Sequence, residues 1–335
     1  MPYSRHATIK IQDCERSVLS NKKEVPVTVL MCVYNAERFL VPAVDSVLSQ
    51  TFEDFEFLII DDGSSRRSVE ILKRFAALDS RIRLISRENR GFVVSLNEGL
   101  QEARGKWIMR LDHDDIATPE RLEKQLAYLE RHPECVVLGG AFDYIDDKGR
   151  LLTTIYPPED NDTIQQMLLA GHNALCDSTL IFHRDLARQL GGYRLEMMLG
   201  EDLDLWLRMS EHGQVANLPD VLCQYRLHTR SLSGAHHERQ REVMRKACEE
   251  AWARRGIAGH FEAEEPWRPS PDRSSRLRFD LMYGWWAFNS GERRTAAIYG
   301  CRAISTMPWR ADGYRLLACA LLKRVKTKRD RQTSA

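Results

Sequence analysis

Apolar runs alternate with amphipathic segments along the chain from Val25 onward, whereas residues 1–24 are polar and mixed. Each short apolar run, rich in β-branched residues, predicts a buried strand. Segments with apolar residues at helical spacing follow the first four runs and predict helices. The predicted strands cover residues 25–34, 55–60, 81–86, 106–111 and 135–140. This alternation is typical of an α/β fold, with a mostly parallel sheet flanked by helices.

Local signals predict where these helices begin. Asn35 is expected to cap a first helix whose apolar stripe lies within 39–48. Gly63 marks a turn before a second helix over about 66–78, and a third helix is expected over about 92–104. Thr118 and Pro119 are expected to open the fourth helix, as its cap and its first residue.

The pattern is less regular after residue 140. Residues 178–183 predict a strand, and residues 201–213 predict a helix that ends at Gly213. Beyond residue 235 the sequence is charged and helical in character, and it ends in a basic tail. The domain organisation we expect is a polar leader over 1–24, an α/β domain over 25–235 and a helical C-terminal region over 236–335.

Composition narrows the class of protein. The 335 residues carry 49 Lys and Arg against 48 Asp and Glu, so the net charge of +1 disfavours a dedicated nucleic-acid-binding protein. We identify neither an N-terminal signal peptide nor an uncharged apolar stretch of membrane-spanning length. The eight cysteines are scattered without a C-x-x-C pair, which favours buried thiols in a reducing compartment. A cytoplasmic protein is therefore expected.

Two acidic clusters directly follow predicted strands, Asp61-Asp62 and the cluster from Asp112 to Asp115. The carboxyl ends of parallel strands form one edge of a sheet, where ligands bind. Asp112 and Asp114 are two residues apart, so in extended chain their side chains point the same way. Carboxylates placed like this suit Mg²⁺ or Mn²⁺ bound to a diphosphate. Taken alone, each cluster is explained more simply as an acidic turn before a helix.

Several common motifs are missing from the sequence. The first strand is not followed by G-x-G-x-x-G, which disfavours a dinucleotide site. The chain also lacks a P-loop, an H-E-x-x-H helix and a G-x-S-x-G elbow. Nucleotide hydrolysis through a P-loop and the common zinc and serine hydrolase mechanisms are therefore disfavoured.

Six motifs together are more specific than either acidic cluster. In chain order they are V-x-V-L-M-C-V-Y-N, L-I-I-D-D-G-S, N-R-G-x₅-N, L-D-H-D-D, G-E-D-L-D-L-W-L-R and Y-R-L-H-T-R-S-L-S. In this order they closely resemble the motifs of the family-2 inverting glycosyltransferases, which have the Rossmann-like glycosyltransferase-A fold. The resemblance covers about residues 25–235, and it implies a nucleotide-sugar donor.

The resemblance also implies roles for individual residues. Tyr34 and Glu37 match positions that hold the nucleoside. Asp62 matches the acid that accepts the N3–H of a uracil-type base, a role that suits a carboxylate because it only accepts hydrogen bonds. Arg90 lies where a basic residue could approach the diphosphate.

Metal and catalytic roles follow in the same way. Asp112 and Asp114 match the D-x-D motif of the family, with Asp114 as the direct ligand of Mn²⁺ or Mg²⁺ and Asp112 in the ribose or metal shell. His228 could complete the metal or phosphate site. Asp202 matches the acid of the E-D motif and is implied to be the general base. Two positions depart from the pattern, because Asp177 stands where relatives often carry a histidine and Cys32 stands where a hydroxyl residue is common.

The implied reaction is an inverting sugar transfer from a UDP- or dTDP-type donor to a hydroxyl group. The acceptor would be a saccharide or a lipid-linked molecule in polysaccharide or glycolipid synthesis. A sugar nucleotidyltransferase is one alternative, but it would need a Gly-rich basic loop after the first strand, where the chain offers only Arg38. A non-catalytic sugar-binding relative is another alternative. The retention of four acids together argues against it, namely Asp62, Asp112, Asp114 and Asp202.

The C-terminal region suggests a peripheral membrane contact. Residues 314–323, YRLLACALLK, form an apolar block too short to span a bilayer, and six basic residues and one acid lie at its end and in the tail. Such a segment can bind the anionic cytoplasmic face of a membrane. A docking helix with a solvated basic end is the simpler interpretation, because Leu and Ala at helical spacing usually belong to a core.

Overall fold

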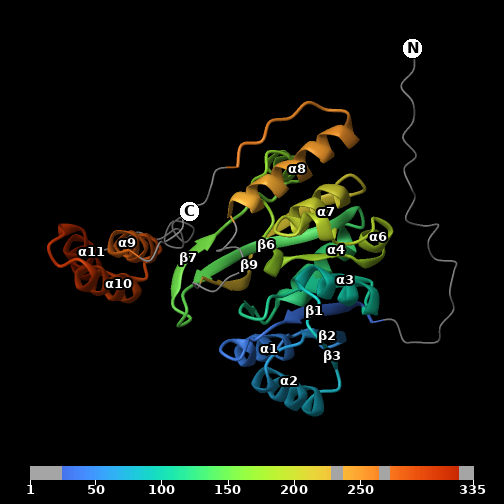
Figure 1. The fold of residues 1–335 in the computed structure, drawn as a ribbon, viewed down its shortest axis with the longest axis horizontal. Helices are drawn as coiled ribbons and strands as arrows, with labels where there is room; N and C mark the ends of the chain where they lie inside the picture. Colours follow the sequence, from blue (N-terminus) through green and yellow to red (C-terminus); the bar gives the residue numbers. More distant parts are fainter. Residues whose placement is uncertain (1–24, 228–236, 264–271, 324–335) are drawn as a thin grey trace.

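The computed structural model describes residues 25–227, 237–263 and 272–323 (Figure 1). The predicted leader, His228 and the basic tail lie outside these ranges. Within them the strands form one nine-stranded sheet in the order β3-β2-β1-β4-β8-β6-β9-β5, with β7 paired to β6. Helices cover both faces of this sheet, so the predicted α/β architecture is confirmed.

The first four long strands are parallel and adjacent. They are β1 (Val27–Val33), β2 (Phe55–Asp62), β3 (Ile82–Arg87) and β4 (Trp107–Arg110). Val29 and Met31 of β1 belong to the core on one face, while Leu30 and Cys32 belong to the core on the other. This alternation explains why the strand reads as an unbroken apolar run, because both of its faces are buried.

The second half of the sheet is mixed. The strand predicted at 178–183 is the short β8 (Ile181–His183), which lies between β4 and β6 (Cys135–Ile145) and is antiparallel to both. β6 continues past the predicted end at residue 140 and runs parallel to β9 (Gln214–Arg226), a strand that the sequence analysis did not predict. β5 (Ile116–Ala117) and β7 (Leu151–Ile155) are antiparallel to their neighbours.

Helices divide between the two faces of the sheet. One face is covered by α1 (Leu40–Leu48), α2 (Arg66–Leu78) and α4 (Arg121–Arg131). The other is covered by α3 (Phe92–Glu102), α5 (Asn161–Leu169), α6 (Arg184–Gln189) and α7 (Glu201–Met209). Two short 3₁₀ turns, η2 (Asp177–Thr179) and η3 (Leu195–Met197), lie between these elements.

Both capping predictions were wrong. Phe39 is the residue that flanks α1, and Asn35 instead has a φ of 53°. The Asn35 side chain accepts a hydrogen bond from the Ser65 amide across 2.8 Å, so it joins the turns after β1 and β2. Helix α4 begins at Arg121 after Glu120, so neither Thr118 nor Pro119 opens it, and the Thr118 hydroxyl donates to the Val221 carbonyl across 3.0 Å.

The C-terminal helices form two packing groups. α8 (His237–Arg255) buries Ala247, Cys248 and Ala251 in the same core as α3, α5 and α7. α9 (Arg273–Asn289), α10 (Arg293–Thr306) and α11 (Ala311–Leu322) form a three-helix unit with its own core, at the left of Figure 1. The expected helical C-terminal region is therefore present, while its boundary at residue 235 stays a prediction. In packing terms α8 belongs with the sheet.

The three-helix unit is attached to the β6–β7 hairpin. Leu152 of β7 is buried in the core of the unit, and the Tyr144 ring of β6 stacks on Trp286 with centroids 5.9 Å apart. The Tyr299 hydroxyl donates to the buried Asp146 carboxylate across 3.0 Å. None of the helices described is long and apolar enough to cross a membrane.

Candidate active site

Three predicted site residues meet at one edge of the sheet. Tyr34 follows β1, Asp62 ends β2, and Asp112 lies two residues beyond β4. Because β1 lies between β2 and β4 and is parallel to both, these positions share the carboxyl edge of the sheet. The structure thus brings the two acidic clusters to the same rim, as the strand pattern predicted.

Asp62 is buried and holds the loop that carries Arg90. Its carboxylate accepts hydrogen bonds from the amides of Arg90 and Gly91, across 2.8 and 3.0 Å, and from the Arg87 guanidinium. A carboxylate offers about four acceptor positions, so three are used and room for one more donor remains. This structural role was not evident from the sequence. If Asp62 also binds the base, its carboxylate must serve both roles.

Gly63 allows the close approach of this loop. Its φ is 74°, and a Cβ added there would lie 2.5 Å from the Asn89 amide nitrogen. A side chain is excluded both by the backbone conformation and by the space available. The glycine of the D-D-G-S motif is therefore required by the packing of the loop after β3.

The remaining predicted donor-binding residues lie closer to the solvent. Tyr34 is 52% exposed, and Arg90 is exposed with Glu88 3.5 Å away. The Glu37 carboxylate accepts a hydrogen bond from the Ser65 hydroxyl, which lowers the pKa of Glu37. Glu37 therefore stays ionised, and its carboxylate contacts the turn after β2.

Arg110 is a central residue that the sequence analysis did not identify. It is 2% exposed, and its guanidinium donates to Asp112 and lies 3.6 Å from Asp202 Oδ1. Burial alone would lower the pKa of Arg110, but the charges of Asp112 and Asp202 outweigh it and the pKa is raised. The available signal was an arginine two residues before the D-x-D motif, on the same side of the strand.

Asp202 is the second residue of α7. Its side chain is 29% exposed, but Oδ1 is buried without a hydrogen-bond partner. Burial and the neighbouring carboxyl groups of Asp177 and Glu201 raise the pKa of Asp202 well above its usual value, and Arg110 opposes this. A carboxylate with a raised pKa is a stronger proton acceptor than an ordinary aspartate, as a general base requires.

Asp177 forms part of the surroundings of Asp202. It begins η2, and its Oδ1 accepts a hydrogen bond from Trp206 Nε1 across 2.9 Å. The charge of Asp177 contributes to the raised pKa of Asp202. Asp177, a position that departs from the family pattern, therefore acts electrostatically on the implied base.

The acidic loop after β4 concentrates negative charge. Asp115 is buried, and burial together with the charges of Asp114 and Asp112 raises its pKa. The Arg226 amide donates to Asp115 across 2.7 Å, and Arg226 Nε donates to the Asp114 carbonyl across 2.8 Å. These contacts fix the backbone of the loop from the far end of β9.

The chemistry of this loop fits a divalent cation. Carboxylate oxygens are the ligands that Mg²⁺ and Mn²⁺ prefer, and Mg²⁺ often takes one or two carboxylates plus substrate phosphates. Within the described ranges no group of three or more His, Cys, Asp or Glu residues could hold a metal by itself. Asp112 and Asp114 would therefore act together with a ligand that brings its own oxygens.

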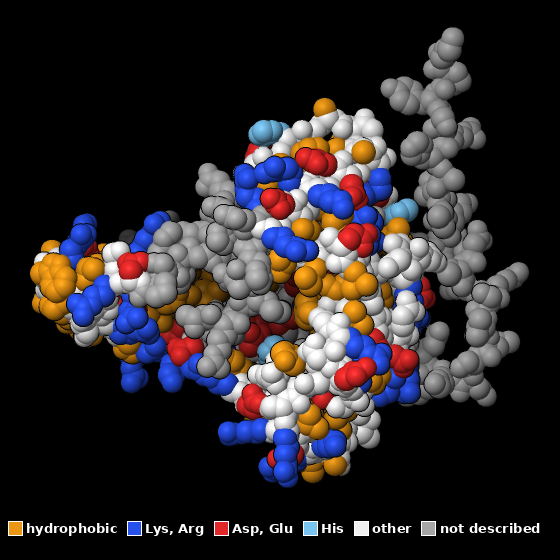
Figure 2. All heavy atoms as spheres, viewed as in Figure 1, with side chains coloured by type: hydrophobic (Ala, Val, Ile, Leu, Met, Phe, Trp, Pro, Cys, Tyr) orange, Lys and Arg blue, Asp and Glu red, His pale blue; other side chains and the backbone are white. Residues whose placement is uncertain are grey.

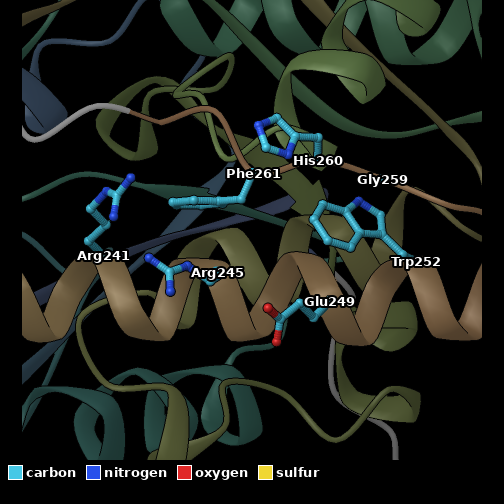
Figure 3. Close-up of a pocket in the computed structure, with 7 residues that line it drawn as sticks. All are labelled: Arg241, Arg245, Glu249, Trp252, Gly259, His260 and Phe261. Carbon is cyan, nitrogen blue, oxygen red and sulfur yellow. The ribbon is translucent and has the colours of Figure 1, made fainter.

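A separate hollow of about 310 Å³ lies between α8 and residues 259–261 (Figure 3). The guanidinium groups of Arg241 and Arg245 lie 5.4 and 5.7 Å from the centre of the Phe261 ring. None of the predicted site residues within the described ranges lines this hollow. The candidate site is thus the sheet edge around Asp112 and Asp202.

Comparison with known sequences gives a consistent family. The family described as Glycosyl transferase family 2 matches residues 28–191. An uncharacterized glycosyltransferase of Haemophilus influenzae is 32% identical over 231 residues, which cover 66% of this chain and 71% of the relative. The amylovoran biosynthesis glycosyltransferase AmsE of Erwinia amylovora is 34% identical over 59% of this chain and 75% of its own.

Solved structures share the fold. TarS of S. aureus, in complex with UDP-GlcNAc, aligns with a TM-score of 0.56 and 16% identity, over 88% of this chain and 87% of its own. The mannosyltransferase PcManGT of Pyrobaculum calidifontis, in complex with GDP-Man and Mn²⁺, aligns with a TM-score of 0.52 and 17% identity. That alignment covers 93% of this chain and 83% of the mannosyltransferase. At such low identity these structures establish the fold alone.

Proposed function

Because this chain belongs to glycosyl transferase family 2, we propose that it moves a sugar, with inversion, from a UDP- or dTDP-type donor to an acceptor hydroxyl. The acceptor is a saccharide or a lipid-linked molecule in polysaccharide or glycolipid synthesis, as the name of the AmsE relative suggests. One observation carries the proposal. Arg110 lies between Asp112, on the donor side, and Asp202, the candidate base.

The donor nucleoside lies at the ends of β1 and β2. Tyr34 is exposed enough to contact the base or ribose, and Glu37, three residues later, remains ionised. The remaining acceptor position of Asp62 takes the N3–H of a uracil-type base. Arg90 approaches the diphosphate from the loop that Asp62 holds.

Asp112 and Asp114 would hold Mn²⁺ or Mg²⁺, and the Mn²⁺ complex of PcManGT supports the use of a divalent ion. His228, outside the described residues, is a further candidate ligand. When bound, the ion neutralises the charge that develops on the leaving diphosphate. The protein residues orient the acidic loop. Arg110 contacts the Asp112 carboxylate, and Arg226 contacts the Asp114 carbonyl.

Asp202 acts on the acceptor. It removes the proton from the attacking hydroxyl, and such a role contributes about 10²–10⁴-fold to the rate. The acceptor oxygen forms a bond to the anomeric carbon while the bond from that carbon to the diphosphate oxygen breaks. A single displacement by the acceptor oxygen inverts the anomeric centre, so the reaction does not need a carboxylate as nucleophile.

A peripheral contact with the cytoplasmic face of a membrane remains part of the proposal. One side of α11 packs into the three-helix unit, where Leu316, Cys319 and Ala320 are buried, as the docking-helix interpretation predicted. The other side leaves large apolar side chains exposed, namely Tyr314, Leu321 and Leu322.

Turnover tests the proposed reaction directly. A panel of nucleotide sugars is screened for thermal stabilisation with and without Mn²⁺, and each stabilising donor is then incubated with saccharide acceptors. We expect release of UDP or dTDP, and a product whose anomeric configuration is opposite to that of the donor by proton NMR. Retention of configuration would rule out the single displacement.

A further inference from the structure

A groove of about 640 Å³ lies on the three-helix unit, between α9 and the start of α11. Its apolar lining comes from both sides, namely Leu277, Leu281, Met282, Trp285, Met307 and Trp309. Arg278, Arg310 and Asp312 also line it, and Arg310 forms an ion pair with Asp312 across 3.0 Å. Trp309 is 70% exposed, which is unusual for so large an apolar side chain. We call this surface the aromatic groove.

Charge is distributed very unevenly between residues 272–335, which comprise the three-helix unit and the basic tail, and the rest of the chain. Residues 272–335 contain 14 Lys and Arg and 5 Asp and Glu, a net charge of +9. Since the whole chain carries +1, residues 1–271 carry −8. Figure 2 shows basic side chains around hydrophobic ones at the end of the molecule that α10 and α11 occupy. The aromatic groove therefore belongs to the positive end of an asymmetrically charged protein.

We propose that the aromatic groove docks on an anionic phospholipid membrane. Tryptophan prefers the boundary between headgroups and acyl chains, because its ring is apolar and its N–H is polar. Arginine binds lipid phosphate through several donors at once. Trp285 and Trp309 would enter the boundary region, and Arg278 and Arg310 would contact the phosphates beside them.

Charge also argues against other occupants of the groove. Residues 324–335 carry five basic residues and one acid, so the basic tail would meet Arg278 and Arg310 as like charges. A symmetric contact with a second copy would bring two three-helix units together, each with a net charge of +5 over residues 272–323. An anionic membrane is attracted to the same charges.

Vesicle flotation with the full chain tests the proposal. One set of vesicles contains phosphatidylcholine with phosphatidylglycerol, and the other contains phosphatidylcholine alone. We expect binding to the anionic vesicles that weakens as salt rises. Trp309→Ser, and Arg278→Gln combined with Arg310→Gln, should each lower this binding by about an order of magnitude.

Matched control variants distinguish vesicle binding through the aromatic groove from nonspecific hydrophobic and electrostatic binding. Leu78→Ser removes an apolar side chain that is 74% exposed on α2, and Arg66→Gln removes an exposed charge from the same helix. Both control variants should bind as the unchanged protein does. Circular dichroism melting verifies that every variant is folded.

Fluorescence gives a second readout that does not depend on affinity. Brominated phosphatidylcholine in the anionic vesicles should quench tryptophan emission less in Trp309→Phe than in the unchanged protein. Three results would overturn the proposal. They are absence of binding to anionic vesicles, equal binding by groove and control variants, and a dimer seen by light scattering that Trp309→Ser dissociates.

Discussion

Arg110 Nη1 lies 3.6 Å from Asp202 Oδ1, where the end of β4 meets the start of α7. The same guanidinium donates to Asp112, so one buried cation touches both the proposed donor side and the proposed base. Arg110 also lies over the Phe92 ring, 5.4 Å from its centre. A planar group with five donors can hold two carboxylates at once, which a lysine cannot do in the same way.

Arg110→Lys should therefore lower turnover while leaving the positive charge in place. We expect kcat to fall by about 10–100-fold, because the lysine can contact one carboxylate but not hold both. The melting temperature should also fall, since one half-buried carboxylate loses its partner. Steady-state kinetics and thermal melting measure the two effects. An unchanged kcat would show that the bridge is not needed for the reaction.

Asp202→Asn keeps the size of the side chain but removes the proton acceptor. Turnover should fall by about 10²–10⁴-fold, while the affinity for the nucleotide sugar changes little. Isothermal titration measures donor binding separately from catalysis. Asp45→Asn, at an exposed position on α1, is the matched control and should remain active. Equal activity of both variants would remove Asp202 from the role of base.

The pH dependence should report the electrostatic effect of Asp177 on Asp202. Burial and the carboxyl groups of Asp177 and Glu201 raise the pKa of Asp202, and a base works only when ionised. Activity should thus increase with pH through this raised pKa. Asp177→Asn removes one of the negative charges, so the pKa of Asp202 should fall and the rising limb of kcat should move to lower pH. A limb that stays in place, or moves upward, would contradict this assignment.

Metal dependence tests the acidic loop. Asp114→Asn should abolish the part of donor binding that depends on Mn²⁺ and should reduce transfer strongly, because one hard oxygen ligand is lost. Binding of the donor without metal should change less. Titrations with Mn²⁺ and with EDTA distinguish the two contributions. Full transfer in excess EDTA, with Asp114→Asn unimpaired, would exclude the metal role.

The fold of the parallel half could be predicted because its signals are local. The apolar runs of β1, β2 and β4 are buried on both faces, that of the edge strand β3 is half-buried, and an amphipathic helix follows each run. β9 was missed because its 13 residues mix polar and apolar side chains, and its partner β6 is far away in sequence. The position of β8 between β4 and β6 likewise depends on long-range pairing that no local pattern encodes.

The candidate site likewise contains residues that could be predicted from the sequence and one that could not. Asp62, Asp112 and Asp202 were found because they sit in short motifs, although their roles remain predictions. Arg110 was missed because its position two residues before the D-x-D motif does not by itself reveal its approach to Asp202. Its importance depends on α7, which is about 90 residues later in the sequence.

The attachment of the three-helix unit can be tested through a single hydroxyl group. The buried Asp146 carboxylate accepts hydrogen bonds from Tyr299 Oη across 3.0 Å and from Arg150 Nε across 2.6 Å. Tyr299→Phe removes the first of these and should lower the free energy of unfolding by about 1–3 kcal/mol, because a buried charged group loses a donor. Tyr314→Phe removes a hydroxyl at a side chain that is 49% exposed and should change stability much less. Urea unfolding measures both variants. Equal stabilities would show that the Tyr299 hydroxyl does not hold the unit to the β6–β7 hairpin.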